Sequence, residues 1–344
     1  MLNTAVSFVR KYWVRTLLIL LMSVALGGAL VFYSVKQYLE TPIFLNEPRV
    51  VAIEPGSSLT QITRRLENDG ILNWPRVLVL WARWQGIDRL VRTGEYELTP
   101  GLTPVSLMSL LMSGRNVQYP VTLVEGWTVR QSLEHLWAQE SVLVTLSDKT
   151  DEEIMAILQS PFPALEGNLF PDTYFFTRNT TDEAILKRAH SRLLEVLEAE
   201  WQVREPELPY DSPWQALIMA SIIEKESGYQ AEKADIAGVF VRRLQQGMRL
   251  QSDPTIIYGM GSAYSGVIRR SDIDTTTPWN TYRIDGLPPT PIAISGRDSI
   301  RASLNPNPGT ALYFVSRGDG SHQFSDTLQE HNAAVRRYLR NNNE

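Results

Sequence analysis

One stretch near the start of the chain is apolar throughout, unlike the mixed pattern that follows it. No residue from Thr16 to Val35 is charged, and as a helix these 20 residues would span about 30 Å. That length matches the hydrocarbon core of a bilayer. The pattern therefore predicts one transmembrane helix over residues 16–35.

A cleaved signal peptide is the alternative interpretation of this stretch. Leu17–Leu26 has the length of a signal-peptide apolar region, and small residues follow it at 27–29. The apolar run nevertheless continues to Tyr33, and aromatic residues suited to the membrane interfaces flank it: Tyr12, Trp13, Tyr33 and Tyr38. These features favour an uncleaved anchor.

The distribution of basic residues around this stretch predicts its orientation. Three basic residues precede the span closely, Arg10, Lys11 and Arg15, whereas only Lys36 follows it closely. Positive charge tends to stay in the cytoplasm. Residues 1–15 are therefore expected to be cytoplasmic and the rest of the chain to be exported.

Residues 48–116 show a pattern of short alternating elements. A strand is predicted over 50–54, and Ser58 with Gln61 forms a capping box for a helix that ends at Asp69-Gly70. A second helix should begin at Pro75 and end at Gly86, with a buried face of Val77, Leu80, Trp81 and Trp84. A strand over 94–98 and a helix from Thr103-Pro104 to Gly114 complete a mixed α and β unit.

The first strand, the turn and the first helix of this unit resemble a LysM-like motif, a family of small modules associated with peptidoglycan glycans. The alternative is a spacer domain without a ligand. A domain boundary is expected near Asn116, and residues 117–344 should form a larger mixed unit. The fold class is thus α+β, with an N-terminal transmembrane helix, a small LysM-like α+β module and a larger mixed α+β catalytic domain.

Within the larger domain, a strand over 121–124 and the turn Glu125-Gly126 precede a helix capped by Thr128 and Gln131. Another helix should start at Thr180 and run to Trp201. The most informative segment is Trp214–Ser227, whose apolar spacing predicts a helix closed by Gly228 in a left-handed C-cap.

The last turn of this helix carries two acidic residues. Glu226 continues the stripe of Met219, Ile222 and Ile223, whereas Glu224 should point about 200° away from it. Burial beside isoleucines and the negative end of the helix dipole should both raise the pKa of Glu226, as a proton donor requires. The alternative is that Glu226 forms an ion pair with Lys225, Lys233 or a nearby arginine.

Composition excludes several other kinds of chemistry. The chain has 33 basic and 38 acidic residues, for a net charge of -5, so we expect no nucleic-acid partner. It has no cysteine and four histidines, none paired at i, i+4, so we expect no metal site and no cofactor. A G-x-S-x-G serine nucleophile motif is also absent from the sequence.

Several distinctive blocks are spread along the chain: Glu166–Tyr174 (EGNLFPDTY), Ile222–Glu226 (IIEKE), Leu250–Thr255, Tyr258-Gly259, the Asn280 loop and Glu330–Asn332. Together these blocks resemble the YceG-like family of endolytic murein transglycosylases, and the resemblance runs along essentially the whole chain. One departure is Thr290, where the family usually has glycine after the paired prolines.

The resemblance implies that Glu226, the second glutamate of the IIEKE block, is catalytic. It also implies a lytic cut between N-acetylmuramic acid and N-acetylglucosamine of nascent peptidoglycan, leaving 1,6-anhydro ends and terminating strand elongation. The expected partners are glycan strands, the bacterial inner membrane and peptidoglycan synthases (penicillin-binding proteins), with the catalytic domain in the periplasm. Candidate sugar contacts are Gln251, Asp253, Tyr258, Asn280 and Tyr282.

Two other functions stay open at this point. A muramidase would hydrolyse the same bond and would need a second acid, for which Asp172, Asp253 and Glu224 are the nominees. A non-enzymatic glycan-binding scaffold would need none. Asp253 has a structural alternative too, closing an Asx-type turn before Pro254.

Overall fold

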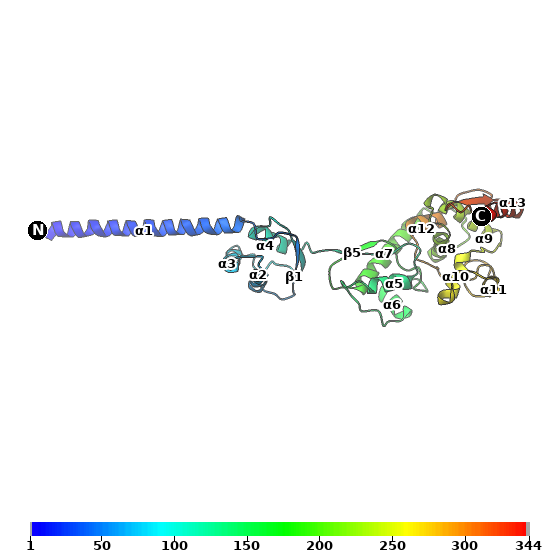
Figure 1. Cartoon of the computed structure of the whole chain (residues 1–344), viewed down its shortest axis with the longest axis horizontal. Coiled ribbons are helices and arrows are strands. Elements are labelled where there is room, and N and C mark those ends of the chain that lie inside the picture. Colours follow the sequence, from blue (N-terminus) through cyan, green and yellow to red (C-terminus); the bar gives the residue numbers. More distant parts are fainter. Residues whose placement is uncertain (1, 342–344) are drawn as a thin grey trace. The chain divides into compact units, whose positions relative to one another are not determined.

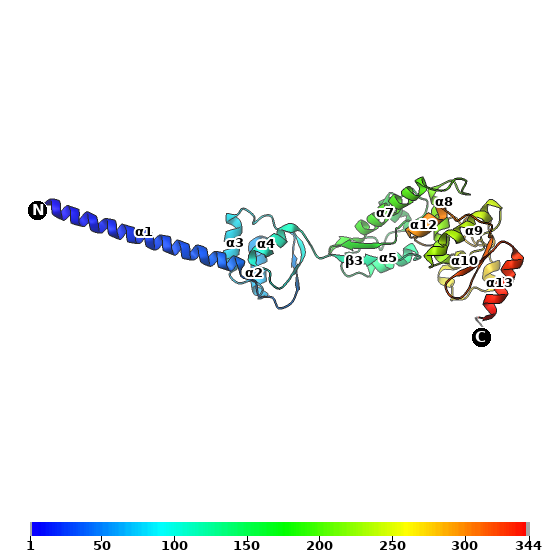
Figure 2. The same cartoon turned by 90° about the horizontal axis from the view of Figure 1, so that it is seen from above.

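The computed structural model describes residues 2–341, with side chains at 13 and 15–338, and divides into two compact units. Unit 1 is Met1–Gln118 and unit 2 is Tyr119–Glu344, so the boundary falls close to the expected one near Asn116. Both units mix helices with short strands (Figures 1 and 2). The α+β class predicted from the sequence is confirmed.

Unit 1 begins with one uninterrupted helix, α1 (Leu2–Glu40). Its segment Arg15–Glu40 is long and apolar enough to cross a membrane, and none of its most apolar part is buried in protein. The end of α1 is packed instead, because Leu39 and Ile43 lie in the core of the following module. The flanking residues Arg10, Lys11 and Tyr12 have side chains outside the described part, so the orientation stays a prediction.

The module that follows α1 contains two strands and three helices. Strand β1 (Arg49–Ile53) pairs antiparallel with β2 (Gly94–Leu98), with Val51 opposite Tyr96. The capping box predicted at Ser58 is present. The structure shows a second capping box at Thr103, where the sequence predicted only a helix start, and Gly114 takes the left-handed cap with φ 71°. Between and after the strands lie α2 (Leu59–Asn68), α3 (Pro75–Trp84) and α4 (Pro104–Ser113).

The buried face of α3 was predicted only in part. Val77 and Trp81 are half-buried, and Trp81 packs against the core. The structure buries Pro75, Leu78, Val79 and Ala82, whereas Leu80 is 64% exposed and Trp84 79% exposed. Both faces of this helix are apolar, so spacing alone does not decide between them, and packing against α2 turns the stripe that contains Leu78 and Ala82 inward. A patch of large apolar side chains is left on the surface.

Unit 2 begins with small sheets and helices around one core. Strand β3 (Tyr119–Thr122) pairs antiparallel with β5 (Thr173–Phe176), and β4 (Val142–Leu143) pairs parallel with β6 (Thr180–Thr181). The helices are α5 (Val129–Trp137), α6 (Asp151–Leu158) and α7 (Asp182–Gln202). Thr181 caps α7 in place of the predicted Thr180, and its side chain accepts a hydrogen bond from the N–H of Ala184.

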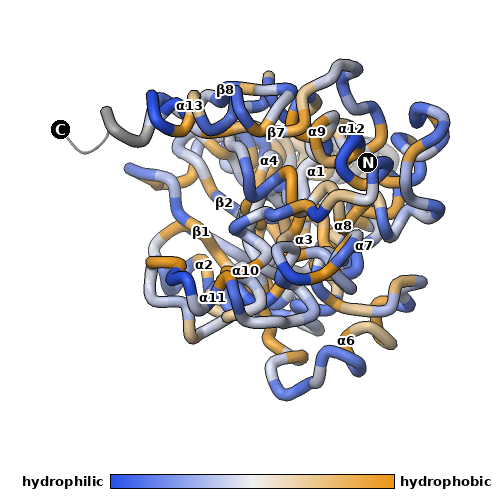
Figure 3. The backbone as a smooth tube through the Cα atoms, turned by 90° about the vertical axis from the view of Figure 1, so that its right-hand side faces the viewer, coloured by the Kyte–Doolittle hydropathy of each residue, from blue (hydrophilic) through white to orange (hydrophobic). Residues whose placement is uncertain are grey.

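The second half of unit 2 is built around α8 (Pro213–Glu226), which packs against α7, α9, α10 and α12. Figure 3 shows the backbone coloured by hydropathy, with hydrophilic and hydrophobic stretches interspersed. Strands β7 and β8 form an antiparallel pair near the C-terminus. The remaining elements are η1 (Gln230–Glu232), α9 (Lys233–Gln245), α10 (Asp253–Met260), η2 (Gly261–Ala263), α11 (Arg270–Asp274), α12 (Arg297–Leu304), β7 (Tyr313–Ser316), β8 (His322–Ser325) and α13 (Leu328–Asn341).

Candidate active site

Helix α8 carries the two candidate acids into the interior of unit 2. Ser212 caps the helix by accepting a hydrogen bond from the backbone N–H of Gln215, and Pro213 fits its first turn. Every residue from Ala216 to Ile223 is buried. The middle of the helix therefore has protein on all sides, whereas Lys225 in its last turn is exposed.

The end of α8 differs from the prediction. Gly228 is not a left-handed cap. Ser227 closes the helix in an extended conformation, with φ −143° and ψ 128°, and its hydroxyl accepts a hydrogen bond from the N–H of Tyr229 at 3.0 Å. The chain continues into η1 instead of reversing, so no left-handed residue is required.

Glu224 is a structural residue. Its side chain is 5% exposed and forms an ion pair of 2.9 Å with Lys233, which is 6% exposed. Its other carboxylate oxygen accepts a hydrogen bond from the N–H of Gly296 at 3.0 Å. The expectation that Glu224 points away from the interior was wrong, because α9 and the loop before α12 cover that side of α8 as well.

Glu226 has a different environment. It is partly buried, and its carboxylate accepts a short hydrogen bond from the hydroxyl of Ser252. Among the ion pairs of the described residues none involves Glu226, and Lys233 pairs with Glu224. Burial raises the pKa of Glu226 to about 7, while the Ser252 hydrogen bond acts in the opposite direction. The raised pKa expected from the sequence is confirmed.

Ser252 is itself fixed in place from several sides. Its N–H donates to the hydroxyl of Thr281 at 2.9 Å, and its carbonyl accepts from the hydroxyl of Thr255 at 2.6 Å. All three residues are almost fully buried. The sequence analysis missed Ser252 as a site residue, although it lies in the block Leu250–Thr255, because a serine before Asp-Pro looks like an ordinary turn or cap.

Asp253 and Tyr282 adjoin Glu226. The hydroxyl of Tyr282 donates to Asp253 at 2.7 Å. The N–H of Thr255, which an Asx-type turn would direct to Asp253, donates instead to the carbonyl of Ser252 at 3.2 Å. The negative charge of Asp253 contributes to the raised pKa of Glu226. Arg243 lowers that pKa through its positive charge while its guanidinium donates to the carbonyls of Leu250 and Leu312, each at 2.7 Å.

The other predicted sugar contacts lie in different settings. Gln251 is exposed next to Ser252 and adopts a left-handed φ of 52°. Asn280 is 1% exposed, and its amide donates to three loop carbonyls, those of Asp272, Ile273 and Thr275. Its side chain thus holds the loop that presents Thr281 and Tyr282.

Tyr258 lines a cavity of about 790 Å³ and contacts a second unusual acid, Glu166. Burial raises the pKa of Glu166 to about 7, although the N–H groups of Val129 and Gly167 donate to it at 3.0 and 3.2 Å. The hydroxyl of Tyr258 lies 3.4 Å from its other oxygen. The sequence analysis quoted Glu166 as part of a family block but gave it no role.

Glu226, Ser252 and Asp253 do not line this cavity themselves, but residues next to them in the sequence do. Lys225 and Pro254 line it, and these residues adjoin Glu226 and Asp253 in sequence. Trp279 also lines it and packs edge-on against Tyr258, with ring centroids 5.7 Å apart. Thr290, the departure from the family pattern, accepts a hydrogen bond from the Trp279 indole at 2.9 Å.

Of the nominees for a second acid, only Asp253 adjoins Glu226. Asp172 is exposed and accepts a hydrogen bond from the N–H of Thr173 at 2.7 Å, and Glu224 is ion-paired. His322 bonds to Glu232, and His331 stacks on Tyr313. The described residues contain no group of three or more His, Asp or Glu side chains placed to hold a metal.

Comparison with known proteins agrees with this geometry. The model of the YceG-like family matches residues 51–337, which include both acids of α8 and the block around Ser252. The chain belongs to the YceG-like family.

Individual members of the YceG-like family resemble the chain over most of its length. The endolytic murein transglycosylase of Bacillus subtilis strain 168 is 30% identical, over 86% of this chain and 86% of that protein. Its counterpart in Streptococcus pneumoniae D39 is 26% identical, over 96% of this chain and 65% of the pneumococcal one. The crystal structure of a yceG-like protein of Listeria monocytogenes superposes with a TM-score of 0.52 at 27% identity, covering 84% of this chain and 99% of that one.

Proposed function

We propose that this chain is an endolytic murein transglycosylase that cuts between N-acetylmuramic acid and N-acetylglucosamine in peptidoglycan, with Glu226 as its catalytic acid and base. The observation that supports this most is the state of Glu226. It is a partly buried carboxyl with a pKa near 7, without an ion pair among the described residues, and fixed by Ser252. The names of the Bacillus and pneumococcal relatives agree with this reaction.

In the first step, protonated Glu226 donates its proton to the glycosidic oxygen, and the bond from the muramic acid carbon to that oxygen breaks. The 6-hydroxyl of the same muramic acid then attacks that carbon, and the carboxylate of Glu226 accepts its proton. The product is a 1,6-anhydro ring, no water is consumed, and Glu226 ends protonated as it began. An intramolecular nucleophile gives this route a proximity advantage.

The surroundings of Glu226 allow one carboxyl to act first as the proton donor and then as the proton acceptor. A pKa near 7 keeps a useful fraction protonated at neutral pH, and the hydroxyl of Ser252 stabilises the anion that forms after proton donation. The negative charge of Asp253 would favour a positively charged transition state at the sugar. Tyr282 holds that carboxylate in position.

We further propose that the cavity beside this site receives part of the glycan strand. Its lining combines two aromatic rings, Tyr258 and Trp279, with charged side chains at Arg130, Glu134 and Lys225. Aromatic rings pack on sugar faces, while charged and amide groups bond to hydroxyls. Gln251 is exposed next to Ser252, where it can bond to a neighbouring sugar.

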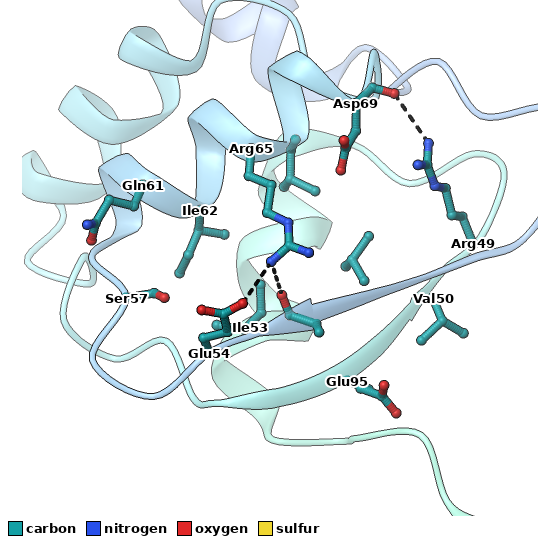
Figure 4. A pocket seen from close by; sticks show the side chains of 13 residues that line it. Arg49, Val50, Ile53, Glu54, Ser57, Gln61, Ile62, Arg65, Asp69 and Glu95 are labelled. Carbon is teal, nitrogen blue, oxygen red and sulfur yellow. Dashed lines mark hydrogen bonds and ion pairs between the residues drawn. The ribbon is translucent and has the colours of Figure 1, made fainter. Parts of the chain in front are cut away.

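For the module of unit 1 we propose a LysM-like role in holding glycan. The strand, turn and first helix that suggested this resemblance are present as β1, the loop at Gly56 and α2. A groove of about 430 Å³ between β1 and α2 is lined mainly by polar side chains, among them Arg49, Gln61 and Glu95 (Figure 4). In the same view Arg65 bonds to Glu54, which stiffens one wall.

The location follows from the same proposal. We place α1 across the inner membrane with the N-terminus in the cytoplasm and both folded units in the periplasm, within reach of nascent strands and their synthases. An enzyme anchored there would release growing strands and so limit their length.

Product analysis separates this function from hydrolysis by a muramidase. Purified peptidoglycan is digested with the full chain in detergent micelles, and the fragments are weighed by mass spectrometry. A lytic cut leaves anhydro-muramyl ends, whereas hydrolysis leaves reducing ends heavier by one water. If only reducing ends formed, the chain would be a muramidase and the lytic mechanism would be wrong. If the strands stayed intact, the result would favour a non-enzymatic glycan-binding scaffold.

A further inference from the structure

The junction between α1 and the module of unit 1 is a fixed contact. Leu39 and Ile43 are buried in the module core, and the hydroxyl of Tyr38 donates to the carbonyl of Asn73 at 2.7 Å. The ring of Tyr38 also lies 6.1 Å from that of Trp74. The orientation of the module relative to α1 is therefore set by packing.

This junction places part of the module at the depth of lipid headgroups. The uncharged stretch of α1 ends at Val35, and Tyr38 follows about 4.5 Å further along the helix axis. The headgroup layer on each side of a bilayer is about 5–7 Å thick. If the uncharged stretch fills the hydrocarbon core, Tyr38 and the adjacent Trp74 lie within that layer.

Helix α3 lies at the same end of the module. In both Figure 1 and Figure 2 it stands beside the end of α1, and Figure 1 shows β1 on the far side of the module. Four large apolar side chains on and near α3 form what we call the aromatic face: Phe44, Trp74, Leu80 and Trp84, which are 71%, 69%, 64% and 79% exposed. Tryptophan is the residue most characteristic of membrane interfaces.

Basic side chains accompany the aromatic face. A groove of about 730 Å³ between α2 and α3 is lined by Arg64, Arg76 and Arg83, and also by Trp74 and Leu80. Glu67 is the one acidic residue among the described residues that line it. Arginine next to tryptophan and leucine is the combination that binds an anionic headgroup while apolar groups enter the acyl boundary.

We propose that the aromatic face and the three arginines of this groove form a membrane-docking surface, which rests on the headgroups of anionic phospholipids in the bilayer that α1 spans. Trp74, Leu80 and Trp84 enter the interface, and Arg64, Arg76 and Arg83 bind lipid phosphates. Continuity with α1 favours lipid over a protein partner, because Trp74 packs beside Tyr38 where the helix leaves the bilayer. This inference requires α1 to span a membrane and is independent of the catalytic proposal.

The absence of cysteine from the sequence makes a direct test simple. Leu80→Cys and Trp84→Cys, each in the full chain, are spin-labelled and placed in nanodiscs of phosphatidylethanolamine and phosphatidylglycerol. The accessibility of each label to oxygen is compared with its accessibility to a water-soluble nickel chelate. Val50→Cys on β1, which is 48% exposed, is the matched control. Since all three positions are exposed, the substitutions leave the core intact.

We expect the labels at 80 and 84 to have an oxygen-to-nickel accessibility ratio at least severalfold above that of the label at 50. Equal ratios at all three positions would overturn the proposal, and since the nanodiscs contain no second protein, they would point to a protein partner for this face. Arg64→Glu with Arg76→Glu should lower the ratio at 84 in these nanodiscs. An unchanged ratio in that double variant would show that Arg64 and Arg76 do not contribute to membrane docking.

Discussion

Ser252 donates its hydroxyl hydrogen to the carboxylate of Glu226 across a separation of 26 residues in the chain. A hydrogen bond to the anion lowers a carboxyl pKa, so Ser252 moderates the increase that burial causes. The activity of a general acid falls as pH rises through its pKa. The pH profile of cutting therefore reports on this contact.

Ser252→Ala should move the fall in activity to higher pH, because the anion of Glu226 loses its donor. The rate at the optimum should drop about tenfold, the scale of one lost hydrogen bond to a charged group. Both changes are measured by following glycan cutting from pH 5 to 9. A fall in rate without a shift in profile would mean that Ser252 only supports the fold.

Asp253→Asn should move the same profile in the opposite direction. Removing a negative charge beside Glu226 makes its anion easier to form and so lowers its pKa. The loss of activity should then begin at lower pH than in the unaltered chain. Tyr282→Phe is the control, because it removes the hydrogen bond to Asp253 but leaves the charge in place. If both variants gave the same shift, the charge would not be the cause.

The position of the acids could be predicted from the sequence only in part. The spacing of Met219, Ile222 and Ile223 predicted that Glu226 is partly buried and that its pKa is raised, as the structure has it. It did not place Glu224, because helical spacing does not reveal that α8 is covered on all sides. Ser252 reaches Glu226, and Tyr282 reaches Asp253, through tertiary packing of distant loops, which no local pattern encodes.

The positions of the helices were easier to predict than the side of each helix that is buried. Capping boxes at Ser58 and Thr128 marked helix starts correctly, since each depends only on two residues three positions apart. Helix α3 shows the limit, because it is apolar on both sides and only its packing against α2 exposes Trp84. The end of α8 shows a second limit. Gly228 fitted the sequence pattern of a left-handed C-cap, but the chain continues into the 3-10 turn η1 and needs no such cap.

Glu224→Gln should destabilise unit 2 without acting on the chemistry. It leaves Lys233 buried without its partner, and breaking a buried pair costs about 3–5 kcal/mol. The measurement is the unfolding midpoint in urea. The double variant Glu224→Met with Lys233→Met removes both charges and should recover much of the loss. A single variant as stable as the unaltered chain would contradict the structural role of Glu224.

Glu226→Gln should stabilise unit 2 at high pH. A folded-state pKa near 7, above the ordinary 4.5, means that the folded chain holds the proton more tightly, so stability declines as pH rises from about 4.5 to 7. The glutamine variant lacks this decline. Its advantage should be small at pH 4 and reach about 3 kcal/mol at pH 8, since one pKa unit corresponds to about 1.36 kcal/mol. Equal stability at both pH values would mean that Glu226 titrates normally.

The most direct test of the central claim compares the products formed by the unaltered chain and by Glu226→Gln on the same peptidoglycan. Glutamine keeps the size and polarity of the side chain but does not exchange the proton, so we expect cutting to fall by about 10²–10⁴. The unaltered chain should leave anhydro-muramyl ends in the mass spectrum, and these should nearly vanish with the variant. Anhydro ends formed by Glu226→Gln at an undiminished rate would show that another residue carries the reaction.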